Sequence, residues 1–343
     1  MSMLRQDPLT GRWVIIAAGR SARPNDFPVT PAVKTESENC PFCPGNESQT
    51  TPEIVVLGRP KNLPANSPGW RLRTFKNMFP ALVPEPAPDA QDSEGLDNQN
   101  LFAQSTGVGH HEVVVYEANH EANPATLKVN QWAELLRVLR ARTQVMAEHP
   151  EVRYVSAFCN RGAEAGATLV HPHMQIIGAP EVPLIAVAKS DRAAEYFAAH
   201  DRCLVCDLVA AEQKDGARIV SQNDQWVCFT PWASRFPWEL LFVPLTHKTS
   251  LMKATDHELL ALAELLTPAL RLLFKRHGDL SLNIVIHNAS LGAPGCSQDQ
   301  EAHHWHLEIL PRLSRPAGLE VGTGYAINAV VPEEAALWLR ENG

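Results

Sequence analysis

The sequence predicts an α+β protein built from two tandem domains of the same design, each an antiparallel sheet with one main helix on a face. The first observation is an internal repeat, because each of two Cys-x-x-Cys pairs is followed by the same series of segments. The second is composition, since 27 prolines among 343 residues favour a loop-rich α+β protein over a helix bundle. The third is length, which exceeds the usual size of a single core, so we place the domains at residues 1–190 and 191–343.

The first repeat unit begins at CPFC, with Cys40 and Cys43. An apolar run, HEVVVYEANH, then predicts a strand that leads to His120. Apolar residues at helical spacing predict a helix over residues 130–149, and VRYVSAFCN predicts a strand over 152–160. That strand leads to a His-Pro-His sequence.

The second repeat unit begins at CLVC, with Cys203 and Cys206. The run WELLFVPLTH predicts a strand that leads to His247. A helix is predicted over residues 255–278, where it opens with a Thr/Glu capping box, and LSLNIVIHN predicts a strand over 280–288. That strand leads to a His-Trp-His sequence, so five elements recur in the same order and indicate a duplicated unit.

Each unit offers the ligands of a tetrahedral metal site. Two thiolates two residues apart and two imidazoles suit Zn2+, and four protein ligands make such a site structural rather than catalytic. The predicted ligands are Cys40, Cys43, His120 and His171 in the first unit, and Cys203, Cys206, His247 and His304 in the second. The alternative is that one or both pairs are reduced, metal-free cysteines. Cys159 and Cys228 lie in apolar runs and are expected to be small buried hydrophobes.

The sequence HPHMQ is the candidate catalytic strand. Alternating polar and apolar residues predict a strand whose one face carries His171, His173 and Gln175. An imidazole nitrogen is a competent nucleophile towards phosphorus, and a carboxamide can donate hydrogen bonds to phosphoryl oxygens without adding negative charge. The preceding loop contains Gly162 and Gly166, which allow backbone amides to approach a phosphate. His173 is therefore the candidate nucleophile and Gln175 its helper; a buried histidine without a catalytic role is the alternative.

Charge and hydropathy exclude several classes of partner. The net charge of −8 argues against binding to nucleic acid or to an anionic membrane. No apolar run approaches the length of a membrane span, and the N-terminus lacks the pattern of a secretory signal, so we expect a cytoplasmic protein. Residues 84–109 are rich in Pro, Asp, Gln and Gly and predict a long loop.

The segment GATLVHPHMQIIGAP resembles the active-site strand of the galactose-1-phosphate uridylyltransferase family, which belongs to the histidine-triad superfamily. GRSARP, CPFCPGNE, FKNMFPAL and HHWHLEILPRLSRPAGLEVGTGYAIN also resemble family segments, in the expected order. The resemblance implies two tandem histidine-triad-like domains, a homodimer, and a double displacement in which His173 carries the nucleotidyl group between a nucleotide sugar and a sugar 1-phosphate. It further implies substrate contacts from Arg20, Arg23, Phe75, Asn77, Asn160, Gly166, Ala167, Thr168, Gln175, Gly322, Gly324 and Tyr325.

This chain departs from some family members. Glu320 and Val321 stand where some members carry a lysine and an aromatic residue near the sugar, and the His-x-His of an iron site is broken here at His306 and Glu308. The CLVC pair resembles instead a two-zinc branch that includes ADP-glucose phosphorylase-like enzymes. The leading prediction is exchange between UDP-glucose and galactose 1-phosphate.

Two alternatives stay open. One is an ADP-glucose phosphorylase-like adenylyltransferase with phosphate as acceptor. The other, more remote, is a non-catalytic zinc module that binds nucleic acid or protein. For any enzyme of this kind we expect nucleotidylation at His173 and not at His306, because Glu308 would repel a phosphoryl group where Gln175 would not.

Overall fold

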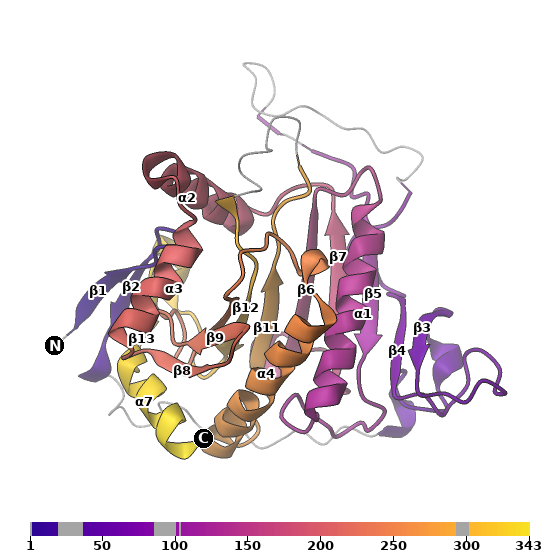
Figure 1. Ribbon diagram of the computed structural model, residues 1–343. Coiled ribbons are helices and arrows are strands. Elements are labelled where there is room, and N and C mark those ends of the chain that lie inside the picture. Colours follow the sequence, from indigo (N-terminus) through magenta and orange to yellow (C-terminus); the bar gives the residue numbers. More distant parts are fainter. Residues whose placement is uncertain (1, 20–36, 86–100, 103, 293–301) are drawn as a thin grey trace.

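The computed structural model describes residues 2–19, 37–85, 101–102, 104–292 and 302–343. Ten strands of these residues form one antiparallel sheet in the order β3-β4-β5-β7-β6-β11-β12-β10-β9-β8 (Figure 1). The first unit supplies β3 (Glu53–Leu57), β4 (Leu72–Lys76), β5 (His110–Val115), β7 (His173–Ala179) and β6 (Tyr154–Arg161). The second unit supplies β11 (Leu282–His287), β12 (His306–Pro311), β10 (Leu240–Pro244), β9 (Trp226–Phe229) and β8 (Ile219–Gln222).

The two long helices, α1 (Val129–Ala147) and α4 (Asp256–His277), lie side by side on one face of this sheet (Figure 1). The apolar stripe of each helix enters a single core that both units share. The predicted capping box begins α4: the Glu258 N–H donates to Thr255 Oγ1 at 3.2 Å, and the Thr255 N–H donates to Glu258 Oε2 at 2.6 Å. The α+β fold with a duplicated antiparallel unit is thus confirmed.

The two units meet at a seam between β6 and β11. These strands pair from Arg161↔Leu282 to Ala157↔Ile286, so the half-sheets join edge to edge. The sequence predicted a sheet in each unit but not this union. The domain boundary between residues 190 and 191 stays a prediction.

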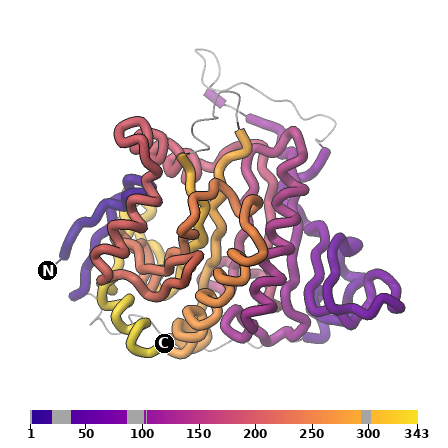
Figure 2. Tube along the Cα trace, viewed as in Figure 1, coloured from indigo at the N-terminus to yellow at the C-terminus, as the bar shows by residue number. Residues whose placement is uncertain are grey.

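A smaller sheet brings the two ends of the chain together. It contains β1 (Met3–Gln6), β2 (Trp13–Ile16) and β13 (Ala326–Asn328), in which β2 pairs with β13 in parallel. The Arg5 guanidinium contacts Glu333 at 3.0 Å, at the start of α7 (Pro332–Asn342), and lies over the Trp232 ring. Residues 3–16 therefore pack on the second unit, and Figure 2 shows both chain ends on that side of the molecule.

Three further helices lie in the connections: α2 (Leu184–His200), α3 (Leu204–Asp215) and the short α6 (Gly318–Thr323). Single turns of 3-10 helix occur at Ser37–Asn39, Glu47–Gln49, Ala163–Ala165 and Leu251–Lys253. Most of the loop predicted at 84–109 lies outside the described residues. In the part of the chain that the structure describes, no helix has the length and apolar character needed to cross a membrane.

Candidate active site and metal centres

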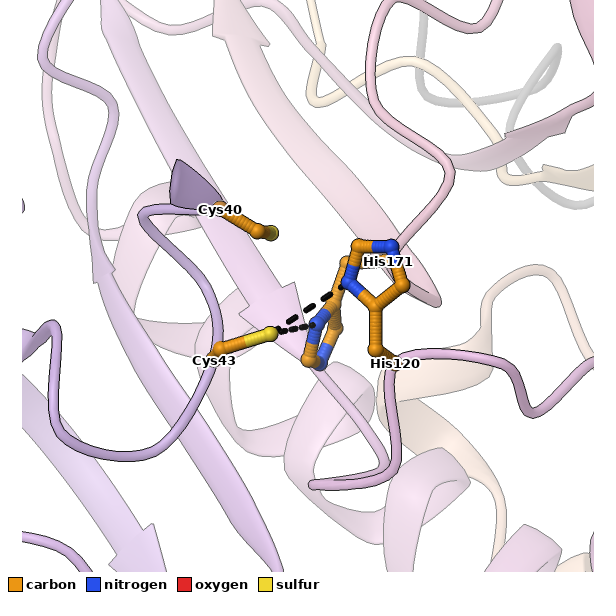
Figure 3. Close-up of side chains that lie close together, drawn as sticks. All are labelled: Cys40, Cys43, His120 and His171. Atoms are coloured by element: carbon orange, nitrogen blue, oxygen red, sulfur yellow. Dashed lines mark hydrogen bonds between the residues drawn. The ribbon is translucent and has the colours of Figure 1, made fainter. Parts of the chain in front are cut away.

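The first predicted metal group is assembled as a compact buried cluster. Cys40 and Cys43 lie on one turn, and His120 and His171 come from connections before α1 and before β7. All four side chains point to one place (Figure 3). Cys43 Sγ lies 3.3 Å from His120 Nδ1 and 3.4 Å from His171 Nδ1. The four donor atoms lie within 4.8 Å of one another, a spacing that fits tetrahedral coordination of a single ion.

The hydrogen bond of His171 prepares its ring for a metal. Its Nε2–H donates to the Glu117 carbonyl oxygen at 2.8 Å, so Nδ1 carries the lone pair that faces the thiols. Burial, and then the negative charge of Cys40, raise the pKa of the Cys43 thiol to about 11. A cation between the two sulfurs would offset both effects. Burial, donor chemistry and tautomer therefore all fit a structural Zn2+.

The second predicted group is more open. Cys206 Sγ lies 3.6 Å from His247 Nδ1 and 3.5 Å from His304 Nδ1, and Cys203 Sγ lies 3.9 Å from His304 Nδ1. The donor atoms again lie within 4.8 Å. His304 is buried, but among the described residues its Nε2 has no hydrogen-bond partner, whereas the corresponding nitrogen of His171 donates to the Glu117 carbonyl oxygen. A large open cavity borders this group and is lined by Cys203, Cys206 and His247.

His173 begins β7, and in the described part of the chain only its Nδ1 is engaged in a hydrogen bond. Its Nδ1–H donates to the His171 carbonyl oxygen at 2.8 Å, which leaves the lone pair on Nε2. The Phe42 ring packs edge to face with the His173 ring, and the two ring centroids are 5.2 Å apart. Burial lowers the pKa of His173, although the bond to the His171 carbonyl opposes this shift, so the ring is neutral at pH 7. A neutral, oriented imidazole is the form that can attack phosphorus.

His171 itself lies just before the strand rather than on it, which corrects the predicted placement. Proline has no N–H to donate to a strand ladder, and Pro172 therefore delays the start of β7 until His173. Because of this short irregular segment, the side chains of His171 and His173 face different partners. His171 turns towards the thiols, while His173 stays on the strand face that it shares with Gln175.

Gln175 is held by a residue that the sequence reasoning missed. His111 lies on the neighbouring strand β5, diagonally across from Gln175, and its Nε2 is 2.8 Å from Gln175 Oε1. The N–H of Ala81 donates to His111 Nδ1 at 3.1 Å, so the ring proton must sit on Nε2 and donate to Gln175. Burial lowers the pKa of His111, although the bond to Gln175 opposes the shift. Gln175 therefore turns its carbonyl to His111 and leaves its amide N–H groups for another acceptor.

The predicted phosphate pocket is only partly brought together. A small cavity joins Asn160, Val170 and His173. Asn160 Oδ1 accepts from the Asn283 side chain of β11 at 2.9 Å, so the second unit helps to orient it. Gly166, Ala167 and Thr168 lie in the connection between β6 and β7, outside this cavity.

The glycines of that connection have conformational reasons to be there. Gly162 and Gly166 both have φ near +79°, in the region that favours glycine. At Gly162 an added Cβ would also lie 2.0 Å from the Ser281 hydroxyl. The shape of the loop therefore depends on these two glycines.

The other predicted substrate residues lie at varied distances from His173. Phe75 on β4 is 2% exposed and packs against Phe42, which in turn contacts His173. The Asn77 side chain lies against the His111 ring. Arg20 and Arg23 lie outside the described residues. Gly322, Gly324 and Tyr325, on and after α6, take part in none of the hydrogen bonds around His173 among the described residues and are at least partly exposed.

The second unit has a buried polar cluster where the first has its catalytic strand. His287, His306 and Glu308 hold donor atoms within 4.8 Å of one another, a set that could hold a metal ion. The ammonium group of Lys189 from α2 already contacts two of them, at 2.7 Å from His306 Nε2 and 2.8 Å from Glu308 Oε1. An iron ion, which the resemblance implies for some relatives, does not fit this arrangement.

His111, Asn283 and Lys189 are the residues that sequence reasoning did not single out. His111 is the first residue of the predicted strand run HEVVVYEANH, but the residue that it holds lies on another strand. Lys189 lies in a helix with only two other buried residues, Ala186 and Ala193, so a lysine there gave no local signal. By contrast, Cys159 and Cys228 are buried as expected.

Two family profiles together span nearly the whole chain. They are described as galactose-1-phosphate uridyl transferase, N-terminal domain, over residues 1–183, and the C-terminal domain of the same enzyme over residues 189–339. The chain belongs to the galactose-1-phosphate uridyl transferase family. As a member of this family it is a nucleotidyltransferase, and the alternative of a non-catalytic zinc module is wrong.

Relatives in the family carry two different names. An ADP-glucose phosphorylase of Arabidopsis thaliana is 31% identical over 98% of this chain and 92% of its own length. A galactose-1-phosphate uridylyltransferase of Thermotoga maritima is 29% identical over 99% of this chain and 98% of its own length. The solved structure of an Arabidopsis thaliana ADP-glucose phosphorylase with bound ADP-glucose matches with a TM-score of 0.80 at 30% identity, over 99% of each chain.

Proposed function

We propose that this family member transfers a nucleoside monophosphate from a nucleotide sugar to a phosphate-bearing acceptor through a covalent nucleotidyl-His173. The observation that carries the proposal is the ring of His173. It is neutral, it is fixed by a hydrogen bond from Nδ1–H to the His171 carbonyl, and its Nε2 lone pair is the nitrogen left to react. Geometry thus selects one nucleophilic atom.

In the first step, the Nε2 lone pair attacks the α-phosphorus of the nucleotide sugar. A P–N bond forms, the P–O bond to the β-phosphate breaks, and the sugar 1-phosphate leaves with the bonding electrons. The imidazole becomes positively charged, and its Nδ1–H bond to the His171 carbonyl strengthens because the donor is now cationic. In the second step an oxygen of the acceptor phosphate attacks the same phosphorus and the P–N bond breaks, which restores neutral His173.

Gln175 stabilises the phosphoryl oxygens in both steps. Its amide N–H groups are the donors available to the substrate because His111 occupies its carbonyl oxygen. Preorganised donors of this kind cost no reorientation when charge develops on the phosphoryl oxygens. His111 is therefore a positioning residue: it keeps the donor end of the carboxamide towards the phosphate and its acceptor end away.

The two Cys2His2 groups are proposed to hold structural Zn2+. Cys40, Cys43, His120 and His171 would hold the first ion and Cys203, Cys206, His247 and His304 the second. Each ion, when bound, would contribute folding energy by linking its cysteine turn to the sheet. The first group also fixes His171, whose carbonyl orients the nucleophile two residues later.

Two substrate pairs have comparable support. UDP-glucose with galactose 1-phosphate follows from the family and from relatives of that name. ADP-glucose with phosphate follows from the 31% identical relative and from the structural neighbour that contains ADP-glucose. Glu320 and Val321, both on α6, depart from some family members at positions that the resemblance places near the sugar, and these departures do not discriminate between the two pairs.

Mass spectrometry of the intact protein after mixing with UDP-glucose or ADP-glucose, without acceptor, tests the mechanism. The expected result is one adduct per chain, with the mass of UMP or AMP, which disappears when the correct acceptor is added. A His173→Ala protein that retains both metals and forms the same adduct would refute the covalent step. Acceptor assays with galactose 1-phosphate and with inorganic phosphate then decide between the two pairs.

The family resemblance also predicts a homodimer, and the place of α6 agrees with a shared sugar site. Gly322, Gly324 and Tyr325 are at least partly exposed and outside the His173 cavity of their own chain. We infer that they contribute to the sugar site only in the dimer. Tyr325→Ala should then weaken sugar binding, and complementation by mixing it with His173→Ala protein should restore part of the activity; mixed protein with no recovery would contradict this arrangement.

A further inference from the structure

A buried ionic cluster joins helix α2 to the sheet of the second unit, away from the proposed nucleophile. We call it the Lys189 cluster. Its members are Lys189 from α2, Arg235 and Glu239 from the segment before β10, His287 from β11, and His306 and Glu308 from β12. Every member is buried except Arg235, whose side chain is 14% exposed. The proposed transfer reaction uses none of these residues.

The ammonium nitrogen of Lys189 occupies the place that a metal ion would take. It lies 2.7 Å from His306 Nε2 and 2.8 Å from Glu308 Oε1, and His287 Nε2 lies 3.1 Å from Glu308 Oε2. The Nδ1–H of His306 donates to the His304 carbonyl oxygen at 2.9 Å, so its Nε2 lone pair faces the ammonium. Two imidazoles and one carboxylate are a common ligand set for Zn2+ and Fe2+.

Charges in the cluster balance with Lys189 as the second cation. Arg235 contacts both Glu239, at 2.8 Å, and Glu308, at 2.6 Å. Burial alone would raise the pKa of Glu308, but the Arg235 guanidinium and the Lys189 ammonium outweigh burial and hold the pKa well below its usual range. Burial lowers the pKa of His287, so that ring is neutral. The hydrogen bonds of His306 use its Nδ1–H as a donor and its Nε2 lone pair as an acceptor, which is the neutral form of the ring. Two cations, the Arg235 guanidinium and the Lys189 ammonium, therefore face two carboxylates, those of Glu239 and Glu308.

We propose that the Lys189 ammonium is a built-in cation that fills a His2Glu metal position and closes it to divalent ions. The cluster is thus a metal-type site completed by a side chain. The same contacts tie α2, which leads into the Cys203 and Cys206 turn, to the strand that follows His304. They also engage the Nε2 lone pair of His306, the nitrogen that corresponds in the repeat to the nucleophilic atom of His173.

Charge balance predicts which substitution opens the position. Replacing Lys189 by glutamate exchanges one positive charge for one negative charge, so the cluster gains two excess negative charges. One divalent ion restores neutrality, and the new carboxylate supplies a further oxygen ligand. Lys189→Arg keeps the positive charge and should stay closed, which makes it the matched control.

The test uses full-length, zinc-loaded protein with Co2+ as the added probe. Native protein, Lys189→Arg and Lys189→Glu are incubated with Co2+ and desalted, and zinc and cobalt are then counted by elemental analysis. We expect one cobalt per chain in Lys189→Glu and less than a tenth of that in the other two. The bound cobalt should show ligand-field bands without thiolate charge transfer, because no cysteine belongs to the cluster. Adding His287→Ala to Lys189→Glu should abolish the uptake.

Two results would overturn the proposal. The first is native protein that itself takes up a stoichiometric cobalt lost in His287→Ala, because the position would then be open. The second is folded Lys189→Glu protein that takes up none. If Lys189→Glu fails to fold, Lys189→Gln removes the ammonium and adds a neutral oxygen ligand; it should bind cobalt more weakly but measurably, and folded Lys189→Gln without cobalt uptake would refute the proposal equally.

Discussion

Replacing His111 by alanine should slow nucleotidyl transfer although His111 is not expected to touch the substrate. The native ring accepts the Ala81 N–H and donates its own Nε2–H to Gln175 Oε1 at 2.8 Å. Alanine removes that donor, and the half-buried carboxamide of Gln175 is then free to rotate. In half of its orientations the carbonyl oxygen would face the phosphoryl oxygens, which repel it.

The magnitude follows from the cost of an unpaired acceptor. Leaving a buried polar atom without its hydrogen bond costs about 1–3 kcal/mol. Because each 1.36 kcal/mol corresponds to a factor of ten in rate, we expect a loss of about 5- to 150-fold in kcat/KM. The loss should appear mainly in kcat, since the donors of Gln175 matter most where charge develops on phosphorus-bound oxygen.

The assay is the rate of adduct formation on His173 in a single turnover, together with steady-state kcat and KM. His110→Ala is the matched control, because His110 is the preceding residue on β5 and its side chain contacts Glu151 instead, at 2.9 Å. His111→Gln should recover part of the rate, since its amide can donate to Gln175. Folded His111→Ala protein with both metals and a rate within twofold of His110→Ala would refute the reasoning.

Three further predictions concern the nucleophile, its counterpart in the repeat and the metals. His173→Ala should lose turnover and the adduct while retaining both zinc ions, which elemental analysis and mass spectrometry check together. Peptide mapping under alkaline conditions should find the nucleotide on His173 alone, because Lys189 engages Nε2 of His306 at 2.7 Å; label on His306 would contradict this. Cys40→Ser should lower the melting temperature more than Cys203→Ser, because the first metal group is wholly buried. Each variant should lose one zinc ion. Equal shifts in melting temperature would show that burial does not determine how much each zinc ion stabilises the fold.

The repeat made much of the fold predictable. The helices expected at 130–149 and 255–278 are α1 and α4, and the strands expected at 152–160 and 280–288 are β6 and β11. Periodicity and the capping box are local signals, so they predict helices and strands without knowledge of the tertiary contacts. The eight cysteines and histidines of the two metal groups also came from spacing, because the same order of ligands occurs twice.

The rest depends on contacts between distant segments. Nothing near β6 indicates that it pairs with β11, since strand pairing is decided by register and burial across the sheet. The pairing of β2 with β13 joins residues more than three hundred positions apart. Lys189 and His111 have ordinary neighbours in sequence, and their roles appear only when α2 and β5 are placed against their partners.

The seam between β6 and β11 has a consequence for dividing this protein. A cut in the connection between Ala179 and Leu184 would give two fragments, each with one complete Cys2His2 group. Produced alone, each fragment would expose β6 or β11 as an apolar edge strand, which is a template for aggregation. Produced together, the fragments could reassemble through that same edge and through β2 and β13. Such a pair would serve as a split reporter: each fragment is fused to one of two proteins, and nucleotidyl transfer reports that these two proteins bind each other.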